Sequence, residues 1–259
     1  MLLDHTLFGL VDKVAIAIQR LQAFEPAEGY YLAFSGGKDS VTIKTLADMA
    51  GVKYDAHYSL TTVDPPELVQ FIKREHKDVE VVRPEKTMWQ LIVENGMPPL
   101  RQMRYCCRIL KEGGGKGRTV MTGIRQSESH KRSKRKLIEP CLATGSLKTY
   151  VNPILDWSDS DVWEFIRKYK VPYCKLYDEG WKRLGCVCCP NGNQLKEAER
   201  WPKIAAGYKR ACIRAYDRKI ASGKKYKYTD LQNGEQMYEW WISGGSSKEQ
   251  MDDQAVIFE

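Results

Sequence analysis

A short glycine-rich turn between an apolar strand and a helix is the part of this sequence best suited to bind phosphate. It follows the apolar run Tyr30–Phe34 and reads Ser35-Gly36-Gly37-Lys38-Asp39-Ser40. Glycines adopt the positive-φ conformations that point successive amides into one concavity, and the start of the next helix adds the positive end of its dipole. The serines can donate hydroxyl hydrogen bonds, Lys38 is a mobile cation, and Asp39 can hold magnesium beside a nucleotide. The alternative is an ordinary tight turn with an exposed lysine.

Cysteines form the second group with potential chemistry. Two adjacent residues and a later CxxC pair can converge as ligands: Cys106, Cys107, Cys186 and Cys189. Four thiolates suit zinc or an iron–sulfur cluster, and the divergent side chains of an adjacent pair fit the separate iron corners of a cubane better than one zinc ion. Arg104 and Arg108 would favour the charged thiolates. Cys188 is a spare ligand or a sulfur carrier. The alternative is that all these cysteines are small buried apolar residues.

Composition limits the setting of both groups. The chain has 259 residues, eight cysteines and a formal net charge of +8, which favours an anionic partner. No apolar run reaches membrane-spanning length, so we expect no membrane partner. The first residues lack the basic and apolar regions of a secretory signal, which predicts a cytoplasmic protein whose cysteines are thiols or metal ligands and not a disulfide framework.

Strand and helix patterns alternate along the chain as a parallel sheet requires. The expected strands are Tyr30–Phe34, Tyr54–Ser59, Val79–Val82 and Arg118–Gly123. The expected helices are Leu7–Phe24, Val41–Ala50, Glu67–His76, Met88–Glu94 and a basic helical run over Leu195–Ile220. We therefore predict an α/β fold, a parallel twisted sheet flanked by helices with a helical, cysteine-rich C-terminal extension. The predicted division is an N-terminal helix in residues 1–27, a nucleotide-binding domain in 28–172 and the extension in 173–259.

Polar motifs follow three of the expected strands. The glycine-rich turn follows the first strand, a stretch containing Asp64 follows the second, and Gly123-Ile124-Arg125 ends the fourth. Ligands of such sheets bind at the carboxyl ends of the strands. The pattern therefore predicts that these motifs share one site.

The turn resembles the PP-loop, SGGxDS, of the adenine nucleotide alpha hydrolase superfamily, whose members usually split ATP between its alpha and beta phosphates. Over residues 28–192 the ordered motifs are similar to those of the phosphoadenosine phosphosulfate (PAPS) reductase family. They are SGGKDS at 35–40, TTVDPPE at 61–67, RYCC at 104–107, GIRxxESxxR at 123–132, NPILDWSDxDVW at 152–163 and the cysteines at 186–189.

The resemblance implies roles for particular residues. The cysteine spacing is similar to that of the adenylylsulfate reductase branch, which implies a 4Fe-4S cluster on Cys106, Cys107, Cys186 and Cys189. It also implies that Arg125 and Arg132 face nucleotide phosphate or the transferred group. The expected nucleotide-binding residues are Ser35, Gly36, Gly37, Lys38, Asp39, Ser40, Asp64, Gly123, Arg125 and Arg132.

Two departures from the reductases shift the expected activity. Reductases carry a nucleophilic cysteine near the C-terminus in a Cys-Gly-(Leu/Ile)-His setting, whereas no cysteine follows Cys212 here. The intact SGGKDS instead resembles the ATP-pyrophosphatase component of DNA phosphorothioation systems and iron–sulfur PP-loop thiolases of tRNA. We therefore expect an ATP-dependent adenylating enzyme in sulfur transfer that uses ATP, magnesium and Lys38, Asp39 and Cys188 as catalytic residues. The alternatives are an adenylylsulfate or PAPS reductase and a non-catalytic nucleotide- or nucleic-acid-binding subunit.

Basic runs suggest which acceptor the sulfur reaches. Residues 130–136 read HKRSKRK after the fourth strand, and residues 203–227 add cations interleaved with tyrosines. Phosphate contacts combined with stacking on aromatic rings are typical of single-stranded nucleic-acid binding, and a solvated surface is the alternative. The candidate partners are an adenine nucleotide, a nucleic-acid acceptor, a cysteine desulfurase as sulfur donor and a second copy of the chain.

Overall fold

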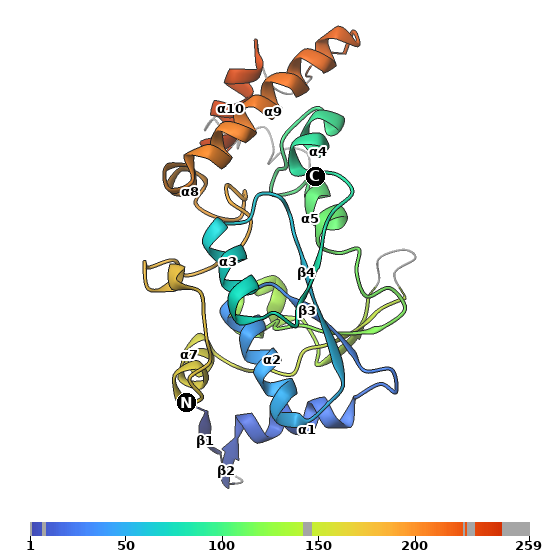
Figure 1. The fold of residues 1–259 in the computed structure, drawn as a ribbon, viewed down its shortest axis with the longest axis vertical. Coiled ribbons are helices and arrows are strands. Elements are labelled where there is room, and N and C mark those ends of the chain that lie inside the picture. Colours follow the sequence, from blue (N-terminus) through green and yellow to red (C-terminus); the bar gives the residue numbers. More distant parts are fainter. Residues whose placement is uncertain (1, 7–8, 142–146, 225, 227–230, 245–259) are drawn as a thin grey trace, which may run out of the picture. The chain divides into compact units, whose positions relative to one another are not determined.

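The described residues form two compact units. The computed structural model describes residues 2–6, 9–141, 147–224, 226 and 231–244 (Figure 1). The first unit comprises residues 1–59, 66–82 and 113–184, and the second comprises 60–65, 83–112 and 185–259. These are units of packing, and the division at residues 27 and 172 stays a prediction.

A six-stranded sheet is the centre of the first unit. Its strands are β3 (Tyr30–Phe34), β4 (Tyr54–Ser59), β5 (Glu80–Val82), β6 (Thr119–Met121), β7 (Ile138–Pro140) and β8 (Thr149–Val151). Their order is β5-β4-β3-β6-β8-β7, and all neighbours are parallel except β7 and β8. The predicted α/β fold with a mostly parallel sheet is confirmed. Because β3 is followed by β4 on one side and flanked by β6 on the other, its carboxyl end lies at the point where the strand order reverses.

Helices of the first unit pack on the sheet and on one another. The helices of this unit are α1 (Lys13–Ala23), α2 (Lys38–Ala50), α3 (Pro66–Glu75), α6 (His130–Ser133) and α7 (Asp159–Lys168), with short 3-10 turns η1 (Gln126–Glu128) and η2 (Lys175–Tyr177). Helix α2 packs on β3 and contacts both α1 and α7. Leu32 of β3 and Ile43 and Leu46 of α2 are fully buried. Burial of these side chains fixes the start of α2 directly beyond the end of β3.

The predicted helix over Leu7–Phe24 is wrong in its first part. Residues Gly9–Asp12 form strand β2, which pairs with β1 (Leu3–Thr6) in an antiparallel hairpin, while residues 7 and 8 lie outside the described residues. Gly9 has a φ of 115°, which favours glycine and belongs to no helix. Asp12 then caps α1, because its carboxylate accepts hydrogen bonds from the amides of Val14 and Ala15.

The second unit is mainly helical. Its helices are α4 (Met88–Asn95), α5 (Tyr105–Leu110), α8 (Gln194–Arg200), α9 (Pro202–Ala221) and α10 (Gly234–Ile242). Tyr208 of α9 is the centre of an aromatic core, with ring centroids 4.9 Å from Trp89 and 4.6 Å from Trp241. The single helical run predicted over Leu195–Ile220 is interrupted, because Pro202 lacks an amide hydrogen and starts a new helix. None of the helices in the described part of the chain has the length and apolar character needed to cross a bilayer.

Candidate phosphate-binding site

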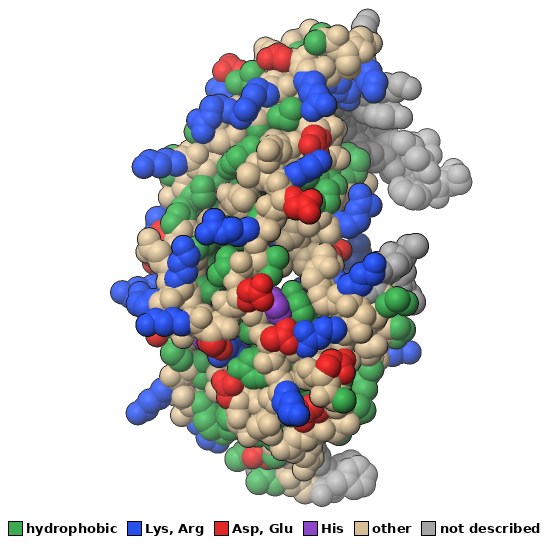
Figure 2. Space-filling view, turned by 45° about the vertical axis from the view of Figure 1, so that its right-hand side comes forward, with side chains coloured by type: hydrophobic (Ala, Val, Ile, Leu, Met, Phe, Trp, Pro, Cys, Tyr) green, Lys and Arg blue, Asp and Glu red, His purple; other side chains and the backbone are tan. Residues whose placement is uncertain are grey.

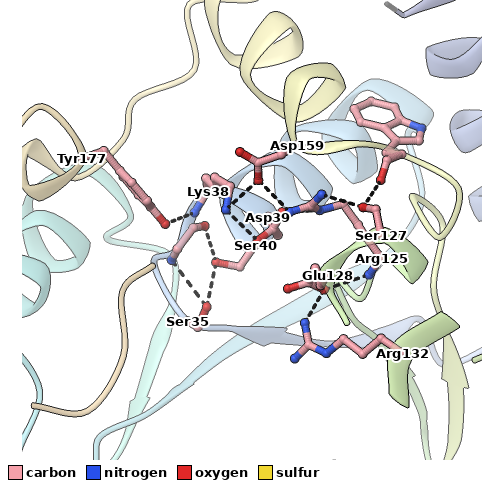
Figure 3. Close-up of polar contacts among 12 residues, drawn as sticks. Ser35, Lys38, Asp39, Ser40, Arg125, Ser127, Glu128, Arg132, Asp159 and Tyr177 are labelled. Atoms are coloured by element: carbon pink, nitrogen blue, oxygen red, sulfur yellow. Dashed lines mark hydrogen bonds and ion pairs between the residues drawn. The ribbon is translucent and has the colours of Figure 1, made fainter. Parts of the chain in front are cut away.

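The glycine-rich turn joins β3 to α2, as the sequence predicts (Figure 3). Gly36 has a φ of 71°, and a Cβ built on it would lie 2.8 Å from the Cδ1 atoms of Leu68 and Ile72. Glycine is therefore required there for two reasons, the backbone conformation and the lack of space. Gly37 is the extended N-cap residue of α2. The amides that begin α2 thus lie at the carboxyl end of β3, where a helix can bind an anion.

Hydroxyl groups of the turn hold its own backbone. The Ser35 hydroxyl accepts from the Gly37 amide at 3.4 Å and donates to the Ser40 hydroxyl at 3.2 Å. The Ser40 hydroxyl donates to the Gly37 carbonyl at 2.9 Å. These bonds connect both ends of the turn, so the predicted serines shape the site in the ligand-free protein.

Lys38 is the cation of the turn, and its side chain is only 8% exposed. Its Nζ lies 3.1 Å from an Asp159 carboxylate oxygen and 3.7 Å from Asp39. Its backbone amide donates to the Tyr177 hydroxyl at 2.8 Å. Helix α7 and turn η2 therefore supply oxygen atoms to both donors of Lys38.

Arg125, which follows β6, is the second cation of the site and is 2% exposed. Its Nε donates to Asp39 at 2.7 Å, and its Nη2 donates to Asp159 at 3.0 Å. Burial raises the pKa of Asp39, and the charges of Lys38 and Arg125 oppose that rise. Gly123 permits this approach, because a Cβ there would lie 2.9 Å from the Cβ of Asp39. The structure thus brings Gly123, Arg125, Lys38 and Asp39 together, as the sequence predicts.

Arg132 is linked to Arg125 through Glu128. Its Nη1 pairs with Glu128, whose carboxylate also accepts from the Arg125 amide at 3.0 Å (Figure 3). Arg132 therefore contacts the Arg125 segment through Glu128, and its predicted contact with phosphate stays a prediction.

Asp64 belongs to the second unit and has local partners there. Its carboxylate accepts from the Thr61 amide at 2.7 Å. Burial raises the pKa of the Cys186 thiol, the Lys111 cation lowers it, and the negative charge of Asp64 raises it again. Asp64 therefore lies close to a cysteine of the second unit, and its predicted role in nucleotide binding stays a prediction.

The four predicted ligand cysteines share one electrostatic environment. Cys106 and Cys107 start α5, and Cys186 and Cys189 precede α8; all four are partly exposed thiols. The pKa of Cys106 is raised by its hydrogen bond to Cys107, by burial and by the charges of Cys107, Cys186 and Cys189. The pKa of Cys107 is lowered because it accepts hydrogen bonds from Cys106 and from Arg104, whose Nη2 lies 3.2 Å from its sulfur. Thiols from two distant segments and a neighbouring guanidinium suit an anionic metal–sulfur centre.

In the described ranges, no group of three or more His, Cys, Asp or Glu side chains is arranged to hold a metal ion. The observation that links the two cysteine segments is electrostatic: Cys106 has a hydrogen bond to Cys107, and the charges of Cys186 and Cys189 act on the Cys106 thiol. The metal that they bind stays a prediction.

Cys188 differs from its neighbours because it is fully buried. Its φ is 56°, its thiol donates to the Gln194 carbonyl at 3.8 Å, and burial raises its pKa to about 12. A buried, protonated thiol is a weak nucleophile. The predicted role of Cys188 as a sulfur carrier stays a prediction, and it requires a conformation in which this sulfur is exposed.

The basic run after β6 contains two kinds of cation. Arg132 and Arg135 pair with Glu128 and Glu139, whereas three lysines are exposed: Lys131, Lys134 and Lys136. On the face drawn in Figure 2, Lys and Arg side chains are spread widely and alternate with Asp and Glu. Any contact that this run makes with an anion therefore depends mainly on the lysines.

Comparison with known proteins identifies the family. Residues 29–192 match the phosphoadenosine phosphosulfate reductase domain, which is more than half of the chain. The chain belongs to this family. Among PAPS reductase relatives, the adenosine 5'-phosphosulfate reductase of Oceanobacillus iheyensis is 29% identical over 166 residues, which cover 60% of this chain and 67% of that protein. That of Allochromatium vinosum is 35% identical over 111 residues, 40% of this chain and 42% of that protein.

Other relatives are longer than this chain. An uncharacterised protein of Methanocaldococcus jannaschii is 32% identical over 187 residues, which are 66% of this chain but only 44% of that protein. Among solved structures, the PAPS reductase of Candida auris in its phosphate complex superposes with a TM-score of 0.50 at 17% identity, covering 66% of this chain and 87% of that one. This likeness shows that the chain has the same fold as the PAPS reductase of Candida auris.

Sequence reasoning missed two residues of the site, Asp159 and Tyr177. Asp159 follows the N-cap residue Ser158, where an acidic residue is expected simply to complement the helix dipole. Tyr177 lies far from the turn in sequence, in a short 3-10 turn. Asp159 is one of three aspartates in the motif NPILDWSDxDVW at residues 152–163, and this motif could have pointed to it as a site residue.

Proposed function

We propose that the protein is an ATP-dependent adenylating enzyme that releases pyrophosphate in a sulfur-transfer reaction. The observation that supports this most directly is the intact turn at the end of β3, where Lys38 and Arg125 are buried together beside the first amides of α2. Cleavage between the alpha and beta phosphates places negative charge on the departing pyrophosphate. Two fixed cations and helix amides stabilise that charge without reorganisation.

Asp39 is the residue that we assign to magnesium. Its carboxylate is 23% exposed and already lies among cations, so it can exchange Arg125 for a divalent ion when a nucleotide enters. Magnesium would neutralise phosphate oxygens there. Lys38 would contact the leaving pyrophosphate, and Arg125 would hold the phosphate chain in place.

For the second unit we propose a 4Fe-4S cluster on Cys106, Cys107, Cys186 and Cys189. The mutual charge effects of these thiols and the hydrogen bond from Arg104 support this set. An adjacent cysteine pair also favours a cluster over a single zinc ion. When bound, the cluster would supply redox or sulfur-binding chemistry.

The acceptor that we propose is a nucleic acid, as in DNA phosphorothioation, with a cysteine desulfurase as sulfur donor. Support comes from the net charge of +8 and from the exposed lysines of residues 130–136. Activation of a phosphate or base oxygen by adenylation would let sulfur displace AMP. This part of the proposal depends on the ATP reaction, which is tested first.

The test is pyrophosphate release from ATP labelled at the gamma phosphate, measured with the sulfur donor and acceptor present. Lys38→Ala should lower the rate about 100- to 1,000-fold, as loss of one electrostatic donor does in other enzymes. Lys44→Ala is the matched control, because Lys44 lies on the same helix, is 12% exposed and pairs with Asp78 at 2.8 Å. It should retain the rate. Release of orthophosphate in place of pyrophosphate would contradict alpha–beta cleavage.

The second candidate is an adenylylsulfate or PAPS reductase. It is favoured by the names of the relatives in Oceanobacillus and Allochromatium. Sulfite production from adenylylsulfate or PAPS with a thiol donor would identify it. A protein that binds nucleotide but gives neither sulfite nor pyrophosphate would be a non-catalytic subunit.

A further inference from the structure

Two oxygen atoms of the protein accept hydrogen bonds from donors of the candidate phosphate site (Figure 3). One carboxylate oxygen of Asp159 accepts from both Lys38 Nζ at 3.1 Å and Arg125 Nη2 at 3.0 Å. The Tyr177 hydroxyl accepts from the Lys38 amide at 2.8 Å. The cations and the amide that would bind phosphate are thus already bound to oxygen within the chain.

The two internal acceptors differ in how firmly they are held. The Asp159 side chain is 63% exposed and starts α7, so rotation about its side-chain bonds can release the carboxylate to water. Tyr177 packs edge-on against Trp163, with ring centroids 5.1 Å apart. Release of Tyr177 therefore requires movement of its ring, whereas release of Asp159 does not disturb the core.

The charges of the site balance in this arrangement. Lys38 and Arg125 carry two positive charges, and Asp39 and Asp159 carry two negative ones within hydrogen-bond or ion-pair distance. A phosphate group has to compete with a carboxylate that is tethered beside it. Once displaced, that carboxylate also repels the polyphosphate.

We propose that Asp159 and Tyr177 occupy the places of two phosphate oxygens in the ligand-free protein, and that nucleotide binds by displacing them. This inference rests on the proposed function, because it takes the turn as the phosphate site. It assigns Asp159 as a residue that sets nucleotide affinity by competition. Removing its charge strengthens phosphate binding, whereas the loss of a merely structural residue would weaken it.

The probe is inorganic pyrophosphate, titrated by calorimetry into the whole protein without divalent cations. Asp159→Asn keeps the size of the side chain and should bind pyrophosphate about two- to fivefold tighter, the range that an exposed ion pair supports. Asp156→Asn is the control, because Asp156 lies in the same segment and pairs with Arg20 at 2.6 Å. It removes the same charge and should leave the affinity unchanged.

Unchanged or weaker binding by Asp159→Asn, or equal tightening by Asp156→Asn, would overturn the inference. Tyr177→Phe gives an independent measurement: it frees the Lys38 amide and should also bind pyrophosphate more tightly, with the thermal midpoint recorded to verify folding. Binding is measured without turnover, so failure of ATP cleavage leaves these results intact. Absence of pyrophosphate binding in the wild type and both variants would overturn the inference together with the phosphate site.

Discussion

Gly36→Ala separates two reasons for a glycine in the turn. A left-handed backbone costs a residue with a Cβ about 1–2 kcal/mol. The added methyl group would also lie 2.8 Å from Leu68 and Ile72, which are buried, and such overpacking costs about 1–3 kcal/mol more. We therefore expect Gly36→Ala to lower the free energy of unfolding by about 2–5 kcal/mol.

Gly51→Ala is the matched control. Gly51 has a φ of 67°, close to that of Gly36, but a Cβ there would meet no atom within 4 Å. It should lose only the backbone contribution of about 1–2 kcal/mol. Urea unfolding of both variants measures the difference, and pyrophosphate titration of the folded proteins should show weaker binding for Gly36→Ala alone. Equal losses of stability in the two variants would refute the packing argument.

Three further outcomes are expected. Burial, and to a smaller extent the Lys44 cation, lowers the pKa of His76 in the folded protein. Below about pH 6.5 the unfolded chain therefore binds more protons than the folded one, and the free energy of unfolding should fall as the pH drops. Urea unfolding of His76→Leu should show a smaller loss of stability over the same pH range. Anaerobically purified protein should contain about four irons per chain, which Cys106→Ser should lose and Cys141→Ser should keep; stoichiometric zinc would contradict the cluster. Replacing the three exposed lysines of residues 130–136 by glutamine should weaken single-stranded DNA binding and reduce its dependence on salt concentration. An equal effect of three lysine replacements elsewhere on the surface would exclude a specific role for residues 130–136. The test triple is Lys131, Lys134 and Lys136, and the control triple is Lys73, Lys77 and Lys170.

The first two strands of the sheet could be predicted residue for residue. Tyr30–Phe34 and Tyr54–Ser59 are ended by clear turn signals, and the structure confirms both ranges. The apolar residues before Asp12 were misread as helical because a short hairpin strand and a helix turn can share the same apolar spacing. Four strands of the described sheet have three residues each; β5 and β6 were expected because they lie within the runs Val79–Val82 and Arg118–Gly123, whereas β7 (IEP) and β8 (TYV) were not expected.

The residues of the candidate site that are consecutive in the sequence could be predicted. The residues that only the tertiary fold brings to the turn could not. Ser35 to Ser40 form one segment, whose glycines and lysine indicate its chemistry directly. Asp159 and Tyr177 reach the turn only because α7 packs against α2 and η2 lies near α3. Their contacts depend on tertiary packing, which local sequence spacing does not encode.

The interleaving of the two units has a consequence for biosynthesis. Segments 60–65 and 83–112 leave the ribosome before the later segment of the same unit, which begins at residue 185. The carbonyl of buried Val63, for example, accepts from the Val187 amide at 2.8 Å. Until that partner is synthesised, these early segments expose apolar surface to chaperones and proteases. A chain truncated before residue 185 would keep this exposure permanently, so the second unit cannot be removed cleanly or expressed as a single contiguous fragment.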